Sequence, residues 1–244
     1  MNIIWVITKR ELKSFFDSLT AYILLVMFLG LSGFFTWIYG SDIFLVGQAT
    51  MQAFFGVAYW TLFFFIPAIT MRTIAEEKRT GTIEIMLTKS VSDWQFVAGK
   101  YLACLLLIVI ALLCTIPFYF TIWKLGPIDH GAVLCGYFGL ILMSSAYISI
   151  GIFSSSITNN QIVSFLLSLL IGVFFLIIFQ ALSGNRTGII GYIFYYLSIS
   201  NHFESISRGV IDTRDIMYFL SITFLGLIMA ETYLVKRNVT KGRL

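Results

Sequence analysis

From His130 to Asn185 the chain carries no aspartate, glutamate, lysine or arginine. A soluble domain averages about 25% charged residues, whereas this chain has 11% and is 59% hydrophobic. A soluble fold of this length would have too few polar side chains to cover its surface. The uncharged stretch is also too long for one membrane crossing, which takes about 20 helical residues. The sequence therefore predicts an all-α integral membrane protein with several transmembrane helices.

Breaks in the apolar pattern divide residues 1–244, taken as a single transmembrane domain, into six predicted spans. The polar, uncharged run 154–161 separates the fourth span from the fifth. Ser92 and Gln95 have the spacing of a capping box, so a helix is expected to begin there, and Pro67 is expected to kink the second span. The predicted spans are 20–39, 52–71, 96–123, 131–153, 162–182 and 216–235.

Two further segments are predicted to lie at the membrane surface without crossing it. Residues 1–18 place apolar side chains on one helical face and Lys9, Arg10 and Lys13 on the other. This pattern predicts an amphipathic interfacial helix, with a plain basic flank as the alternative. The outer segment 186–212 contains the apolar, tyrosine-rich run 189–200, which is too short to cross and predicts a half-inserted, re-entrant helix before the last span.

The distribution of basic residues predicts the orientation of the spans. Twelve lysines and arginines flank the side that holds both termini and the connection after the second span, and four flank the other side. Because basic residues are retained on the cytoplasmic side, both termini are expected in the cytoplasm. The chain is therefore expected to be a multi-pass membrane protein, and the resemblance described below implies a bacterial inner membrane.

The charged stretch 72–95, between the second and third spans, must meet water or another protein, because lipid cannot easily hold so many charges. Within it, apolar residues of the run 82–88 are interleaved with Thr82, Glu84 and Thr88, which favours a short helix with one apolar side that needs cover. Gly81 would supply a turn before that helix. Glu76 and Glu77 would offer carboxylates to the basic groups of a cytoplasmic partner.

The motifs of common enzymes are missing from the sequence. Gly99-Lys100 is followed by Tyr101 and position 94 is Trp, so a nucleotide-binding loop does not match. Neither His130 nor His202 has a second histidine or a cysteine at the spacing of metal ligands. The net charge of +4 is too modest to suggest nucleic acid. We therefore expect no catalytic residue, no bound cofactor and no metal in this chain.

The run from Glu76 to Leu87, followed by Val91-Ser92-Asp93, Gln95 and Gly99-Lys100, closely resembles the signature of ABC-2 type transporter permeases. The resemblance implies a six-span permease fold and a coupling helix, between spans two and three, that docks on a separate cytoplasmic ABC ATPase. The coupling residues that it implies are Glu76, Glu77, Lys78, Arg79, Gly81, Thr82, Glu84 and Leu87.

Three further runs, 65–72, 154–162 and 202–215, resemble the gliding-motility-associated branch of these permeases. One departure is Lys89-Ser90-Val91, where the family usually has a proline before the valine. The branch implies two copies of the ATPase, which would bind ATP and Mg²⁺. It also implies a second permease subunit with a large extracytoplasmic domain, for which a second copy of this chain is the alternative.

Two sets of residues leave alternatives open. The outer residues His202, Glu204, Arg208, Asp212 and Arg214 would contact the extracytoplasmic partner or belong to a merely solvated loop. Ser164, Ser168 and Gly172 recur every four residues, which allows close helix packing either within the chain or between subunits.

The expected function is a permease subunit that couples ATP hydrolysis by its partner to export or mechanotransmission. The alternative is a membrane anchor that assembles a cell-envelope complex and transports nothing.

Overall fold

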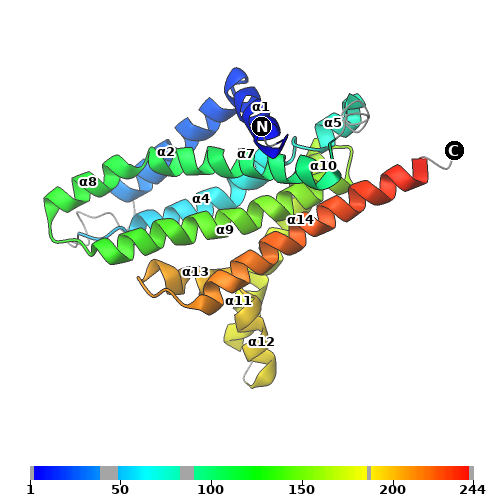
Figure 1. The fold of residues 1–244 in the computed structure, drawn as a ribbon. Helices are drawn as coiled ribbons and strands as arrows, with labels where there is room; N and C mark the ends of the chain where they lie inside the picture. The colour runs from blue at the N-terminus through cyan, green and yellow to red at the C-terminus, as the bar shows by residue number, and fades with distance from the viewer. Residues whose placement is uncertain (1–2, 39–48, 83–90, 186–187, 242–244) are drawn as a thin grey trace.

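The computed structural model describes residues 3–38, 49–82, 91–185 and 188–241, and the regular structure in these residues is helical. The helices form an elongated bundle with α8 at one end and α5 and the C-terminus at the other (Figure 1). Their bounds are α1 Ile3–Asp17, α2 Thr20–Trp37, α4 Gln52–Thr70, α5 Ala75–Thr80, α7 Asp93–Leu113, α8 Ile116–Leu125, α9 His130–Ile157, α10 Gln161–Val173, a π-helix Phe174–Ile178, α11 Phe179–Asn185, α12 Ile189–Leu197, α13 Ile199–Ser207 and α14 Thr213–Lys241.

Six helical segments of the described residues are long and apolar enough to cross a membrane. Each one overlaps a predicted span, so the predicted all-helical, six-span architecture is confirmed. The segments are Thr20–Trp37, Gln52–Thr80, Asp93–Leu125, His130–Ile157, Gln161–Gly184 and Thr213–Lys236.

Helix α9 is the central element of the bundle and packs against α4, α7, α10, α13 and α14. Several of its serines are buried, and some of these hydroxyls bond to neighbouring helices. The Ser145 hydroxyl lies 2.9 Å from the Thr223 hydroxyl and 2.6 Å from the Tyr101 hydroxyl, which joins α9 to α14 and α7. Such bonds satisfy polar groups where water is absent and fix the register between the helices.

Helix α1 occupies the segment predicted to be amphipathic and packs along the start of α7. A Cβ atom on Gly99 would lie 2.7 Å from Ile7 Cγ2, so only glycine allows α1 to approach this closely. The Thr8 hydroxyl donates to the Gly99 carbonyl oxygen over 3.1 Å. Ile7 and Thr8 form the buried face, whereas Trp5 is half exposed.

The predicted third span is one continuous helix, but the structure divides it between α7 and α8. The new helix begins with Pro117 in its first turn, where a missing N–H group costs nothing. Thr115 stabilises the break, because its hydroxyl donates to the Leu112 carbonyl oxygen and lies 2.9 Å from the Tyr137 hydroxyl. The predicted capping box is confirmed, since Ser92 and Gln95 exchange side-chain to backbone hydrogen bonds at the start of α7.

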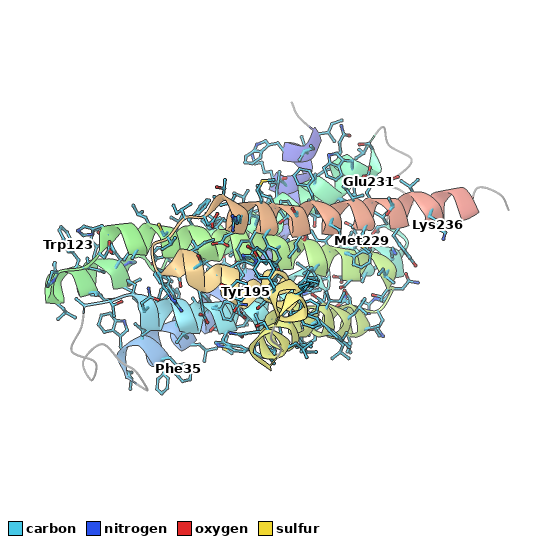
Figure 2. All side chains as sticks on the ribbon, turned by 90° about the horizontal axis from the view of Figure 1, so that it is seen from below. Phe35, Trp123, Tyr195, Met229, Glu231 and Lys236 are labelled. Atoms are coloured by element: carbon cyan, nitrogen blue, oxygen red, sulfur yellow. The ribbon has the colours of Figure 1, made fainter. Side chains whose placement is uncertain are left out.

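The predicted re-entrant segment contains two short helices instead of one. Helix α12 packs on α11, and the pair projects sideways from the bundle (Figure 1). Helix α13 returns to the bundle and packs on α9 and α14. Helix α14 then runs alongside α9, with Glu231 and Lys236 toward the end away from Trp123 (Figure 2). The end formed by α1, α5 and the last turns of α14 is hereafter called the charged end.

Candidate functional site

The candidate site is α5 with the residues that hold it at the charged end. Helix α5 follows α4 after a short turn, and its first N–H groups have no partner within their own helix. The Ser155 hydroxyl, at the end of α9, accepts hydrogen bonds from the Ile74 and Ala75 N–H groups over 3.0 and 2.9 Å. It donates its own hydrogen to the Met71 carbonyl oxygen over 3.2 Å. One serine of α9 therefore caps α5 and holds the turn that precedes it.

Lys78 fixes the inner face of α5. Its side chain is buried, and its ammonium group donates to the Ser156 carbonyl oxygen. The ammonium nitrogen also lies 4.8 Å from the centre of the Tyr233 ring on α14, in a cation–π contact. Through this one side chain α5 is attached to both α9 and α14.

A group of four charged residues joins α5 to α1 and α7. The Lys100 ammonium lies 2.8 Å from Glu77 Oε1 and 3.3 Å from Glu11 Oε2, and its side chain is only 1% exposed. Arg10 pairs with Glu11 and lies 3.5 Å from Glu77 Oε1. A charge buried this deeply requires close partners, so the four residues depend on one another.

The charges of this cluster lower the pKa of the Glu11 carboxyl. Burial alone would raise the pKa of the Glu11 carboxyl, but the Lys100 ammonium and the Arg10 guanidinium outweigh that effect. The pKa of Glu11 therefore lies below its ordinary value of 4.5, and the charged form is favoured in the folded protein.

The outer face of the site consists of the remaining predicted coupling residues. Glu76 pairs with Arg72 over 3.2 Å, and Arg79, Thr80, Gly81 and Thr82 are exposed. Gly81 ends α5 with a φ of 75°, which confirms the predicted turn. Glu84 and Leu87, with the rest of the predicted apolar helix of 83–87, lie outside the described residues.

Two predicted coupling residues are placed differently from the expectation. We expected Glu77 to present its carboxylate to a partner, but it is directed into the bundle because Lys100 and Arg10 bind it there. Lys78 is likewise used inside the chain. Both residues belong to the attachment of α5, whereas Glu76 and Arg79 remain on its accessible side.

The predicted partner-contact residues at the opposite end fall into two groups. His202 is buried, with Nδ1 2.6 Å from Asp215 Oδ1 and Nε2 donating to the Tyr196 carbonyl oxygen, so its ring is not on the accessible surface of this chain. Glu204 and Arg208 are exposed and pair with each other over 3.1 Å. Arg214 is also exposed, and the Asp212 carboxylate accepts from the Arg214 N–H at the start of α14.

The small residues of α10 face into the same chain. Ser164, Ser168 and Gly172 are buried, and α10 packs on α4 and α9. A Cβ atom on Gly172 would lie 2.8 Å from Phe63 Cε2 of α4. Of the two alternatives, packing within the chain accounts for the spacing.

Sequence reasoning did not assign a role in this site to Lys100, Glu11 or Ser155. Lys100 carried a usable signal, because a lysine inside an apolar run must find a partner or a water-filled space. Ser155 carried none, since only the fold brings the end of α9 next to the start of α5.

The geometry defines a multi-pass membrane protein with one short helix fixed across its charged end. The family model described as ABC-2 family transporter protein matches residues 41–235, so the chain belongs to this family. It is thus a transmembrane permease subunit, with the ABC-2 permease fold, and the family implies an ABC ATPase as its partner. A search of curated proteins finds no match to the chain.

Proposed function

We propose that this permease couples ATP hydrolysis by a separate cytoplasmic ABC ATPase to export or force transmission across a bacterial inner membrane. The gliding-motility-associated type is the form that we favour, because the runs 65–72, 154–162 and 202–215 resemble that branch. The observation that carries the proposal is the attachment of α5. Its inner side is bonded to α1, α7, α9 and α14, while Glu76 and Arg79 remain on the outer side.

This attachment would make α5 a transmitter of motion. A short helix with one free end would rotate or fray when a partner pushed on it, and the motion would be lost. Here the Ser155 cap, Lys78 and the Lys100 cluster oppose such movement, so displacement of α5 would move the ends of several spans together. Nucleotide binding in the partner could then bias two arrangements of the bundle.

The remaining parts of the proposal concern topology and partners. Both termini and the charged end would lie in the cytoplasm, as the twelve-to-four distribution of basic residues indicates. ATP and Mg²⁺ would be bound by two copies of the ATPase. The second permease subunit would carry a large extracytoplasmic domain, or would be a second copy of this chain. Reporter fusions after residues 82 and 127 test the orientation, because only the first should report a cytoplasmic position.

The coupling role is tested with two kinds of variant in the reconstituted complex. Arg79→Glu reverses a charge on the accessible side of α5, and we expect the ATPase to be lost on co-purification. Lys124→Glu, an exposed site in α8 at the opposite end, is the matched control and should retain the ATPase. Ser155→Ala leaves that surface intact but removes the cap of α5, which is worth about 1 kcal/mol.

The Ser155→Ala variant distinguishes a permease that transmits motion from a membrane anchor that only assembles a complex. If the chain transmits motion, the complex should assemble normally, but transport or force output per ATP hydrolysed should fall by about fivefold, the factor that corresponds to the lost cap. If the chain is only an anchor, Ser155→Ala should change neither assembly nor output. Retention of the ATPase by Arg79→Glu would remove α5 as the docking element.

A further inference from the structure

The fifth span contains a π-helix, Phe174–Ile178, between α10 and α11. Such insertions are rare, interrupt the regular hydrogen-bond ladder and occur often at functional sites. The carbonyl oxygen of Leu176, inside this turn, accepts a hydrogen bond from the Ser200 hydroxyl over 2.8 Å. Both residues are buried, so this bond satisfies a backbone group that lies away from water.

Ser200 also receives a bond from the second span. The Tyr59 hydroxyl of α4 lies 2.5 Å from Ser200 Oγ. Because Ser200 donates its only hydrogen to Leu176, Tyr59 must be the donor. The Tyr59 ring stacks on Phe203 with centroids 5.0 Å apart. One serine hydroxyl of α13 therefore joins α4 to the π-helix of the fifth span, and we call these three residues the Tyr59–Ser200–Leu176 latch.

Helix α13 holds Ser200 on a rigid support. The His202 ring bonds to Asp215 of α14 and stacks on Tyr218 with centroids 4.0 Å apart. Ile206 packs so closely on α9 that a Cβ atom on Gly139 would lie 3.0 Å from it. The latch therefore connects α4 and the fifth span to a unit that α9, α13 and α14 form.

Packing around the latch leaves space for movement. A cavity of about 260 Å³ lies between α4, α11 and α13, lined by Tyr59 and Ser200 together with Trp60, Gln180 and Glu204. Beyond the π-helix, α11 and α12 project away from the bundle (Figure 1). The two hydrogen bonds therefore act together with the packing of the buried Leu176 to position the fifth span relative to α13.

We propose that the Tyr59–Ser200–Leu176 latch holds the π-helix of the fifth span in place, and that displacement of α4 opens it. Tyr59 lies about 17 Å from the end of α4 at Thr70, at 1.5 Å of helix per residue. A short turn joins α4 to α5 there, so the displacement of α4 that opens the latch rests on the proposed function. Hydrogen bonds of this length are lost after a shift of about 1 Å, which makes the latch sensitive to small movements of α4.

The latch is tested by hydrogen–deuterium exchange of the purified full chain in lipid nanodiscs. Tyr59→Phe keeps the ring and its stacking on Phe203, and Ser200→Ala removes the central hydroxyl. Each variant should raise exchange in the peptide covering 174–185 by about five- to tenfold. Because the two bonds act in series, Tyr59→Phe in the Ser200→Ala background should add almost nothing. Tyr101→Phe, which removes the 2.6 Å contact with Ser145 elsewhere in the bundle, is the matched control.

The outcomes distinguish the existence of the latch from its opening by displacement of α4. The latch is overturned if deuterium exchange in 174–185 stays at the wild-type level in both Tyr59→Phe and Ser200→Ala. It is also overturned if exchange rises equally in the control Tyr101→Phe. With the ATPase present, ATP should raise wild-type exchange in 174–185 toward that of Ser200→Ala, and no response to ATP overturns the opening by α4. If ATP has no effect anywhere in the chain, the proposed function fails while the latch itself stands.

Discussion

Lys100 is the residue whose replacement should damage the charged end most. Its ammonium is 1% exposed and lies 2.8 Å from Glu77 and 3.3 Å from Glu11. At an effective dielectric constant of about 20, these two attractions amount to roughly 6 and 5 kcal/mol before the cost of removing the ammonium from water. Removal of one partner from a buried ion pair costs about 3–5 kcal/mol, because the remaining charge is left uncompensated.

For Lys100→Met we expect a loss of about 3 kcal/mol, the lower end of that range, because Arg10 still lies near both carboxylates. This loss corresponds to a decrease of roughly 6–12 °C in the apparent Tm of a chain of this size. Scanning fluorimetry in one detergent measures the change, and Lys124→Met, an exposed lysine on the same span, should shift the Tm by less than about 2 °C.

A second substitution tests the cause of the loss. In the Lys100→Met background, Glu77→Gln removes a carboxylate that has lost its main partner, so the double variant should be more stable than Lys100→Met alone. If Glu77→Gln lowers the Tm further, or if Lys100→Met is no worse than Lys124→Met, the cluster does not stabilise the charged end in the way described.

Two more predictions concern helix packing and pH. Gly151→Ala places a methyl group against the Thr70 side chain, so α4 and α9 must move apart, at a cost of about 1–3 kcal/mol. The control is Gly30→Ala, whose methyl group meets nothing within 4 Å and should leave the Tm unchanged or raise it slightly. Equal effects of the two substitutions on the Tm would contradict the close approach of α4 and α9. Because the pKa of Glu11 is lowered on folding, its stabilising effect is complete above its ordinary value of 4.5 and disappears as the pH falls through the folded value. The Tm difference between the wild type and Glu11→Gln should therefore stay constant above about pH 5.5 and decrease under more acidic conditions, and a difference that grows on acidification would refute this sign.

Local patterns in the sequence were sufficient for several parts of the fold. The uncharged stretch from His130 to Asn185 required two spans, and Ser92 with Gln95 marked the start of α7. Gly81 marked the end of α5. In each case the physical cause acts over one segment: the cost of burying charge in lipid, an unpaired helix terminus, or a backbone angle that favours glycine.

Other features depended on residues far apart in the chain. The break at Thr115 is stabilised by Tyr137 of the next span, and His202 is buried because it meets Asp215 of α14. Sequence alone left His202 as a surface candidate, since a histidine in a polar run carries no mark of its burial. Charge patterns indicate which residues need partners, but they do not name those partners.

Hydrophobicity and charge along the chain thus determined that the protein crosses the membrane six times and concentrates its charges after the second span. Only the tertiary structure decided that Glu77 binds Lys100, that Ser155 caps α5 and that Ser200 joins Tyr59 to the π-helix. The reason is that transfer into lipid depends on each segment by itself, whereas a buried hydrogen bond or ion pair forms only where packing brings two particular groups within about 3 Å.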